Sequence, residues 1–449
     1  MLANARRTAL FLAAFALPMS AGCAEQEKQS SSQRSIAEGL RAGGSADRDH
    51  RDSPASPGPK RERHCSAPAA REPIAFVDLP GRPFGVVPTR DGCWVFVAVN
   101  AGGSSPATGV ALLHRSHGEL RLERVVELLE RPSGMVLTHD RQLLVAAVGD
   151  GVLFLDVARM LEGVGDPVVG RIHGGPGSIY VNVTPDDALL FVSDEGGATV
   201  TVVDLRRARD GGFAADAIVG RIPVGVAPIA LPVSPDGRWL YGTSQRAAES
   251  WGWPVACKRE GSADPQLVGP QGAVVVIDVA RARVDPANAV VSRVPAGCSP
   301  VRAVLEPEGE VLWVTARNSD ALLAFDASRL VAHPSRALLG GVPVGPSPVG
   351  VAVFKHGRRV VVANSSRFAP DPLQPQTLTV VDARRLEAGA GAVMGTVPAG
   401  AFPRELAVSP DGRTLFVANF LSSTIEVVDL RPFLGHGHME EDEEEDDDR

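Results

Sequence analysis

The chain has 449 residues, a formal net charge of −8, 22% charged residues and 5% aromatic residues. Nine consecutive acidic residues at 440–448 account for the negative excess, so the remainder is close to neutral. This balance excludes a basic face on the scale of the whole protein, and we expect no sequence-specific nucleic-acid binding. The 47 Gly and 36 Pro favour many turns, and therefore many short strands.

Residues 1–22 have the pattern of a secretory signal peptide. Arg6 and Arg7 precede a short apolar stretch at 9–17, and small residues at 20–22 lead to Cys23. Residues 21–23 resemble the bacterial lipobox, which implies lipidation of Cys23 and a membrane anchor. We therefore expect a lipoprotein of the bacterial cell envelope, in the outer membrane or at the surface, facing the periplasm or the exterior. Ordinary secretion with an incidental Cys23 is the alternative.

Two flanking segments lack a periodic hydrophobic pattern. Residues 23–73 are rich in Ser, Gly and Pro and are predicted to form a flexible tether. Residues 433–449 are predicted to form a disordered tail that contains His436, His438 and the acidic run. This tail could bind a divalent metal ion loosely, or a basic partner. A tail that is merely solvated is favoured over both, because its like charges repel one another and no metal cage is preformed.

Self-similarity is the strongest signal in the chain. Seven copies of one unit each begin near a proline, at Pro83, Pro132, Pro176, Pro228, Pro300, Pro348 and Pro403. Each copy continues with a turn such as 234–237 or 409–412, a dense apolar strand and a third strand that ends in Asp in six copies. A fourth strand is visible in several copies, for example at 220–225. Four short strands in ~50 residues without a helical period indicate a propeller blade.

The units resemble the YVTN-type repeat of the YncE-like seven-bladed propeller family. The signature tetrapeptide corresponds here to 191–194, 313–316, 361–364 and 416–419. We predict an all-β fold over 74–432, a seven-bladed β-propeller of four-stranded antiparallel blades. The last copy stops at Leu430 without a fourth strand, so residues 74–79 are predicted to complete that blade and close the ring.

The cysteines other than Cys23 are predicted to form two disulfides. Cys65 and Cys93 belong on one face of the predicted ring, and Cys257 and Cys298 belong on the other. We therefore predict the pairs Cys65–Cys93 and Cys257–Cys298, as expected of an exported chain. The alternative is that Cys65, in the tether, stays free.

Two sets of residues are candidates for ligand binding at the rim and the channel. Trp251 and Trp253 lie in the longest insertion and form either an aromatic platform for a sugar, base or peptide or a packing contact. The position two residues after each proline should line the channel mouth, where it is Arg302 in one copy and Glu405 in another. These two either pair and seal the channel, or Arg302 orients an anionic ligand together with Arg404.

No catalytic motif is present in the sequence. Asp194, Glu195 and Asn419 lie on the predicted rim and could hold a divalent cation as in propeller lactonases, although rim carboxylates are more often solvated. We predict no cofactor, with a divalent metal as the open possibility.

The favoured function is a lipid-anchored, non-catalytic binding or scaffolding module. Its partner would be a protein or small molecule at the rim, and we expect a monomer. A lactonase-type hydrolase with a rim metal and an envelope metal-handling protein that uses the tail are the alternatives.

Overall fold

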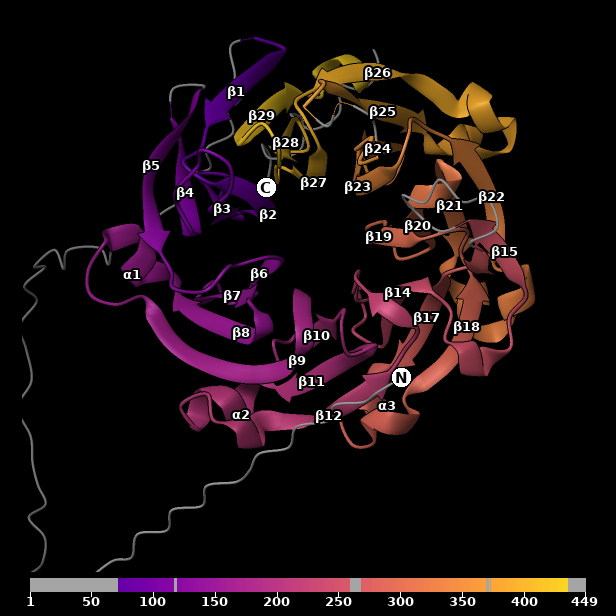
Figure 1. Ribbon diagram of the computed structural model, residues 1–449, viewed down its shortest axis with the longest axis horizontal. Coiled ribbons are helices and arrows are strands. Elements are labelled where there is room, and N and C mark those ends of the chain that lie inside the picture. Colours follow the sequence, from indigo (N-terminus) through magenta and orange to yellow (C-terminus); the bar gives the residue numbers. More distant parts are fainter. Residues whose placement is uncertain (1–71, 117–118, 259–267, 369–370, 372, 435–449) are drawn as a thin grey trace, which may run out of the picture. The chain divides into compact units, whose positions relative to one another are not determined.

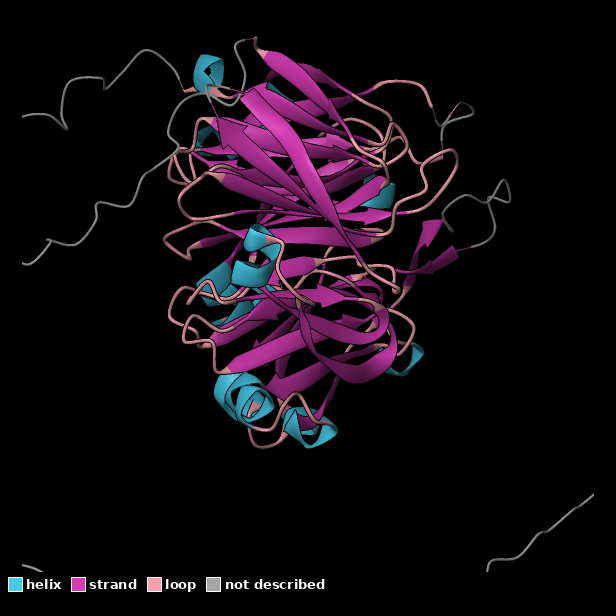
Figure 2. Ribbon diagram, turned by 90° about the vertical axis from the view of Figure 1, so that its left-hand side faces the viewer, coloured by secondary structure: helices cyan, strands magenta, loops and turns pink. Residues whose placement is uncertain are grey.

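The computed structural model describes residues 72–434, apart from 117–118, 259–267, 369–370 and 372. All of these residues belong to one compact unit of the chain, Arg61–Arg449. Strands make up most of it, with short helices at its edge (Figure 2). The predicted signal peptide, nearly all of the predicted tether and the tail from 435 onward lie outside the described residues.

Antiparallel sheets follow one another around a central axis (Figure 1). The first sheet contains β2 (Arg82–Pro88), β3 (Trp94–Asn100), β4 (Gly109–Ser116) and β5 (Glu119–Glu127). A seven-stranded sheet contains β6 (Met135–Leu137), β7 (Leu143–Ala147), β8 (Gly149–Asp156), β9 (Val168–Val183), β10 (Leu189–Asp194), β11 (Thr199–Asp204) and β12 (Ile218–Pro223). The next sheet contains β13 (Val226–Pro228), β14 (Trp239–Arg246), β17 (Ala273–Asp278) and β18 (Val290–Pro295).

Three further four-stranded sheets and one two-stranded ribbon complete the arrangement. The ribbon contains β15 (Val255–Lys258) and β16 (Val268–Pro270). One of the sheets contains β19 (Pro300–Leu305), β20 (Val311–Ala316), β21 (Ala321–Asp326) and β22 (Leu338–Pro343). The next contains β23 (Pro348–Phe354), β24 (Arg359–Asn364), β25 (Gln376–Asp382) and β26 (Val393–Ala399). The last contains β27 (Pro403–Val408), β28 (Thr414–Asn419), β29 (Thr424–Asp429) and β1 (Ile74–Asp78).

The strand β9 runs continuously where the sequence predicts two separate strands. Its first part pairs with β8 and its last part pairs with β10. Ser178 pairs with residues of both neighbouring strands. The preceding residue, Gly177, has a φ of +74°, a conformation that glycine adopts at little energetic cost. The predicted break near Pro176 is therefore a bend within one strand, which joins two groups of strands into a single sheet.

The predicted pairing of the first strand with the last sheet is confirmed. β1 pairs antiparallel with β29, with Ile74 opposite Val428 and Asp78 opposite Thr424. The backbone N–H of Leu79 donates to the carbonyl of Ser423 at 2.9 Å and extends this ladder. Strands from the two ends of the described chain thus share one sheet.

Short helices follow most of the third strands, where the sequence pattern gives no helical period. They are α1 (Val157–Glu162), α2 (Leu205–Asp210), α3 (Val279–Ala282), α4 (Ala327–Ala332) and η6 (Ala383–Ala392). The Asp that ends each preceding strand caps the helix, as when Asp204 Oδ1 accepts from the N–H of Arg207 at 3.0 Å. Such capping satisfies an otherwise unpaired N–H, which explains the repeated Asp. None of the described helices is long and apolar enough to cross a membrane.

The remaining one-turn helices lie in the connections. They are η1 (Ala215–Ala217), η2 (Glu249–Trp251), η3 (Pro286–Asn288), η4 (Arg317–Ser319), η5 (Pro334–Arg336) and η7 (Arg431–Phe433). Leu434 packs against the buried cluster between the last two sheets, two residues beyond the domain boundary predicted at 432.

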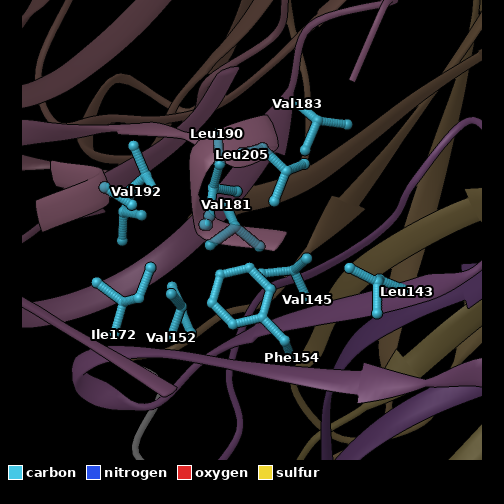
Figure 3. Close-up of a cluster of buried hydrophobic side chains, with 14 residues drawn as sticks. Leu143, Val145, Val152, Phe154, Ile172, Val181, Val183, Leu190, Val192 and Leu205 are labelled. Carbon is cyan, nitrogen blue, oxygen red and sulfur yellow. The ribbon is translucent and has the colours of Figure 1, made fainter. Parts of the chain in front are cut away.

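The core consists of apolar side chains packed between neighbouring sheets. One cluster joins the β7 and β8 strands to β9 and β10, with Phe154 fully buried at its centre and Val145, Val181 and Val192 around it (Figure 3). Because both faces of each sheet are covered in this way, the strand residues form continuous apolar runs. This packing holds the loops and inner strands at the axis in fixed positions.

Candidate functional site

The inner strands of several sheets bring side chains together at the axis. Ile229, Val301, Val349 and Phe402 come from four successive sheets and form one buried cluster. Each follows or precedes one of the repeated prolines by one residue, so the repeat itself places these side chains inward. The axis is therefore lined with apolar groups, and charged side chains beside it lie in a poorly solvated environment.

The predicted ion pair between Arg302 and Glu405 is confirmed. Arg302 Nη2 lies 2.9 Å from Glu405 Oε2, and Arg302 Nε donates to the same oxygen at 3.1 Å. Tyr180 joins them, because its hydroxyl donates to Glu405 and accepts from Arg302, whose Cζ lies 3.7 Å from the centroid of the Tyr180 ring. Burial raises the pKa of Glu405, and the charge of Arg302 opposes that shift.

Arg404, the next residue along β27, is placed very differently. Its Cζ lies 3.7 Å from the ring centroid of Phe84, and the rings of Phe402 and Phe420 lie at 5.7 and 5.5 Å. It makes no hydrogen bond or ion pair with any residue that the structure describes, and its Nε is buried. Burial and the neighbouring positive charge of Arg302 lower the pKa of Arg404 to about 9. The carboxylates of Glu405 and Glu195 oppose this shift, but neither forms an ion pair with the Arg404 guanidinium.

A cavity of about 110 Å³ lies beside Arg404. Its polar lining consists of Arg302, Arg317, Arg367, Arg404, Glu195 and Gln245. Gln245 links two of these groups, since its Oε1 accepts from Arg317 Nη2 at 2.7 Å and its Nε2 donates to Glu195 Oε1 at 3.1 Å. Four guanidinium groups and the carboxylate of Glu195 thus line one cavity, and guanidinium groups suit a negatively charged ligand.

Sequence reasoning found part of this site and missed the rest. It singled out Arg302, Arg404 and Glu405 from one repeat position. It missed Tyr180, although the chain has only two Tyr. It also missed Arg317 and Arg367. Each lies within three residues of the end of the second strand of its repeat, and the two repeats are successive. This shared position could have indicated that both residues lie near the axis.

The three candidate rim ligands for a metal ion do not converge on one point. Asp194 is fully buried and accepts from Ser178 Oγ at 2.8 Å and Thr201 Oγ1 at 2.6 Å. Asn419 Nδ2 donates to Glu426 Oε2 at 2.9 Å, and Glu195 is held by Gln245. Within 72–434, leaving aside its gaps, no group of three or more His, Cys, Asp or Glu could hold a metal ion. The side chains of Asp194 and Asn419 are instead hydrogen-bonded to neighbouring side chains.

The tryptophans of the long insertion lie away from the axial cavity. The ring centroids of Trp251 and Trp253 are 5.3 Å apart and tilted by 59°, and both rings pack partly against the buried cluster of the third sheet. Packing is thus part of their role. Trp253 also lines a larger groove that shares no residue with the axial cavity.

The predicted disulfide between Cys257 and Cys298 is confirmed, with a Cα–Cα distance of 5.6 Å. Cys65 lies outside the described residues, so the pair Cys65–Cys93 stays a prediction. Cys23, His436 and His438 also lie outside them, and lipidation and metal binding by the tail stay predictions as well.

The comparisons with known proteins identify the fold. No family model and no curated protein matches the sequence. Among solved structures, the chain is similar to hydrazine synthase of Kuenenia stuttgartiensis, with a TM-score of 0.57 and 18% identity over 78% of this chain and 96% of that chain. It is also similar to a chain of the mitotic checkpoint complex, with a TM-score of 0.57 and 13% identity over 85% and 99% of the two chains. At such low identity these similarities establish the architecture alone, and the described part of the chain has a β-propeller fold.

Proposed function

We propose that this protein is a non-catalytic binding propeller that takes a small anionic ligand, with a carboxylate or phosphate group, at its axis. The observation that carries the proposal is the partly buried guanidinium of Arg404, whose Nε is enclosed and which forms no hydrogen bond or ion pair with the described residues. Burying an unpaired charge is costly, and a bound anion offsets that cost.

The composition of the cavity supports the same ligand class. Arg302, which is paired with Glu405, and the side chains of Arg317 and Arg367 place three further guanidinium groups beside Arg404. Planar guanidinium groups match carboxylate and phosphate oxygens with paired hydrogen bonds. The cavity of about 110 Å³ beside Arg404 has room for such a group. The remainder of a larger ligand would extend toward the rim.

We further propose seven blades, membership of the YncE-like family and a lipid anchor at Cys23 in the bacterial cell envelope. The seven sequence repeats support the blade count, and β9 supports it by serving as the fourth strand of one blade and the first strand of the next. The YVTN-type tetrapeptides support the family. The lipobox-like residues 21–23 support the anchor, and the absence of a catalytic motif in the sequence favours binding or scaffolding.

Isothermal titration calorimetry with sodium phosphate and sodium malonate at low ionic strength tests the axial site. We expect one of these anions to bind the wild-type protein. Arg404→Gln should weaken that binding about tenfold or more, because a charge-assisted hydrogen bond contributes ~1.5–3 kcal/mol. Arg206→Gln removes the same charge from an exposed position, 65% exposed, and should leave binding unchanged. Failure of both anions to bind, or equal binding by Arg404→Gln, would refute the proposal.

Stability without ligand provides a second readout. Arg404→Gln should not destabilise the ligand-free protein, because removal of the unpaired, partly buried charge offsets the loss of its contact with the Phe84 ring. A loss of stability greater than that of Arg206→Gln would mean that Arg404 has a structural partner instead.

A further inference from the structure

A second concave site lies on the outer side of the propeller, apart from the axis. It is a groove of about 420 Å³ between the insertion that carries β15, the strand β18 and the one-turn helix η5 of the next sheet. In Figure 1, β15 is seen at the periphery of the ring, in the region of β18 and β22. The rings of Trp253, Pro254, Pro295 and Pro334 line it. The groove thus spans two neighbouring sheets.

The disulfide holds the two sides of this groove together. Cys257 follows Ala256, which lines one side, and Cys298 lies three residues after Pro295, which lines the other. Tryptophan and proline rings also have few rotatable bonds. The groove is therefore formed before any ligand binds, which lowers the entropic cost of binding.

The lining favours an extended apolar chain over a sugar. Among its side chains, only Trp253, Gln271, Ser335 and Arg293 carry hydrogen-bonding groups. A sugar presents many hydroxyl groups that would need partners, and these four side chains can pair with only some of them. Grooves lined by aromatic rings instead suit a polyproline II helix, whose own rings fit between them and whose backbone is already extended.

Arg293 adds a charge to the groove. Its guanidinium lies 5.0 Å from the ring centroid of Trp251, and it makes no ion pair or hydrogen bond with the residues that the structure describes. Stacking on the indole holds the guanidinium in place and leaves its N–H groups available. A carboxylate on the ligand would complement this charge.

We propose that this groove binds a proline-rich segment of a partner protein in the polyproline II conformation, with an acidic residue of that segment beside Arg293. The site goes beyond the axial anion site proposed above and shares no residue with it. It would give the propeller a protein-docking surface on its outer wall.

Fluorescence polarisation with three labelled nine-residue peptides tests this proposal. The peptides are three repeats each of Pro-Pro-Glu, Pro-Pro-Gln and Gly-Ser-Glu. The wild-type protein should bind Pro-Pro-Glu best and Pro-Pro-Gln about 2–5-fold more weakly, as expected for loss of an exposed ion pair. Gly-Ser-Glu should bind at least tenfold more weakly. No binding of the Pro-Pro-Glu peptide, or equal binding of Gly-Ser-Glu, would overturn the proposal.

Three variants assign the binding to the groove. Trp253→Ala should weaken Pro-Pro-Glu about tenfold, and Arg293→Gln should abolish the preference for Pro-Pro-Glu over Pro-Pro-Gln. Arg221→Gln is the matched control. Arg221 pairs with Thr201 in β12, and Arg293 pairs with Val275 at the equivalent position of β18. Arg221, however, does not line the groove. Unchanged binding by Trp253→Ala, or equal effects of Arg221→Gln and Arg293→Gln, would exclude this site. Thermal unfolding of each variant tests whether that variant is folded.

Discussion

The guanidinium of Arg404, in β27, lies 3.7 Å from the centroid of the Phe84 ring, in β2. These strands belong to the last and the first sheet, which β1 also brings together by pairing with β29. The contact therefore depends on the same meeting of the two ends of the described chain that completes the last sheet. Closure of the fold and construction of the axial site are thus coupled.

Val77→Pro should destabilise the protein more than Phe76→Pro. The Leu79–Ser423 bond and the alternation of an antiparallel ladder place the N–H of Val77 toward β29 and the N–H of Phe76 away from it. Proline at 77 removes a ladder hydrogen bond, at a cost of ~1–3 kcal/mol, and proline at 76 of this edge strand removes none. Denaturant unfolding measures both values, and equal losses would contradict the pairing.

Tyr180→Phe should lower the unfolding free energy by ~1.5–3 kcal/mol, because the hydroxyl bonds to the charged groups of Arg302 and Glu405. The aromatic ring beneath Arg302 is kept. Tyr241→Phe is the matched control, since Tyr241 is the other tyrosine and its hydroxyl makes no hydrogen bond with the described residues. We expect a change within ~0.5 kcal/mol for Tyr241→Phe. Urea unfolding of both variants would expose any reversal of this order.

Asp194→Ala should cost ~3 kcal/mol of stability or more. Its carboxylate accepts four hydrogen bonds while fully buried, including those from Ser178 and Thr201, and removing it leaves buried donors unpaired. Asp204→Ala removes a helix cap and a surface ion pair with Arg207 and should cost ~1 kcal/mol. A smaller loss for Asp194→Ala than for Asp204→Ala, in the same denaturant assay, would be inconsistent with the buried bracing role.

Asp140 should contribute stability that is lost in acid. Partial burial acts to raise the pKa of Asp140, but hydrogen bonds from Arg209, Thr138 and the backbone N–H of Gln142 outweigh it and lower the pKa to about 2. A carboxyl whose folded pKa is depressed stabilises the fold above its unfolded pKa, near 4, and loses this effect as the pH falls toward 2.

Asp140→Asn should therefore lower the unfolding free energy at pH 7 by ~1 kcal/mol, a value that allows for solvent screening of a partly exposed pair. The difference from the wild-type protein should shrink between pH 4 and pH 2. Thermal unfolding at pH 7, 4, 3 and 2 measures it, and a difference that is constant or grows in acid would show that the ion pair with Arg209 is not its source.

The sequence alone determined the all-β class, the order of the repeated strands, the pairing of residues 74–79 with the final repeat and the Cys257–Cys298 bond. Turn residues and the spacing of apolar runs are local properties that recur in every copy, so they can be recognised without coordinates. The same pattern did not predict the capped helices, because four to six helical residues carry too little periodicity to detect.

Only the tertiary structure decided which side chains share the axis. Tyr180, Arg302 and Glu405 lie in three different sheets, and no local spacing relates them. That Arg404 forms no ion pair with the described residues likewise depends on everything packed around it. The repeat fixes the position that each residue takes within its own sheet. The distances between sheets depend on closure and packing, and these alone bring the charged groups together in a poorly solvated space.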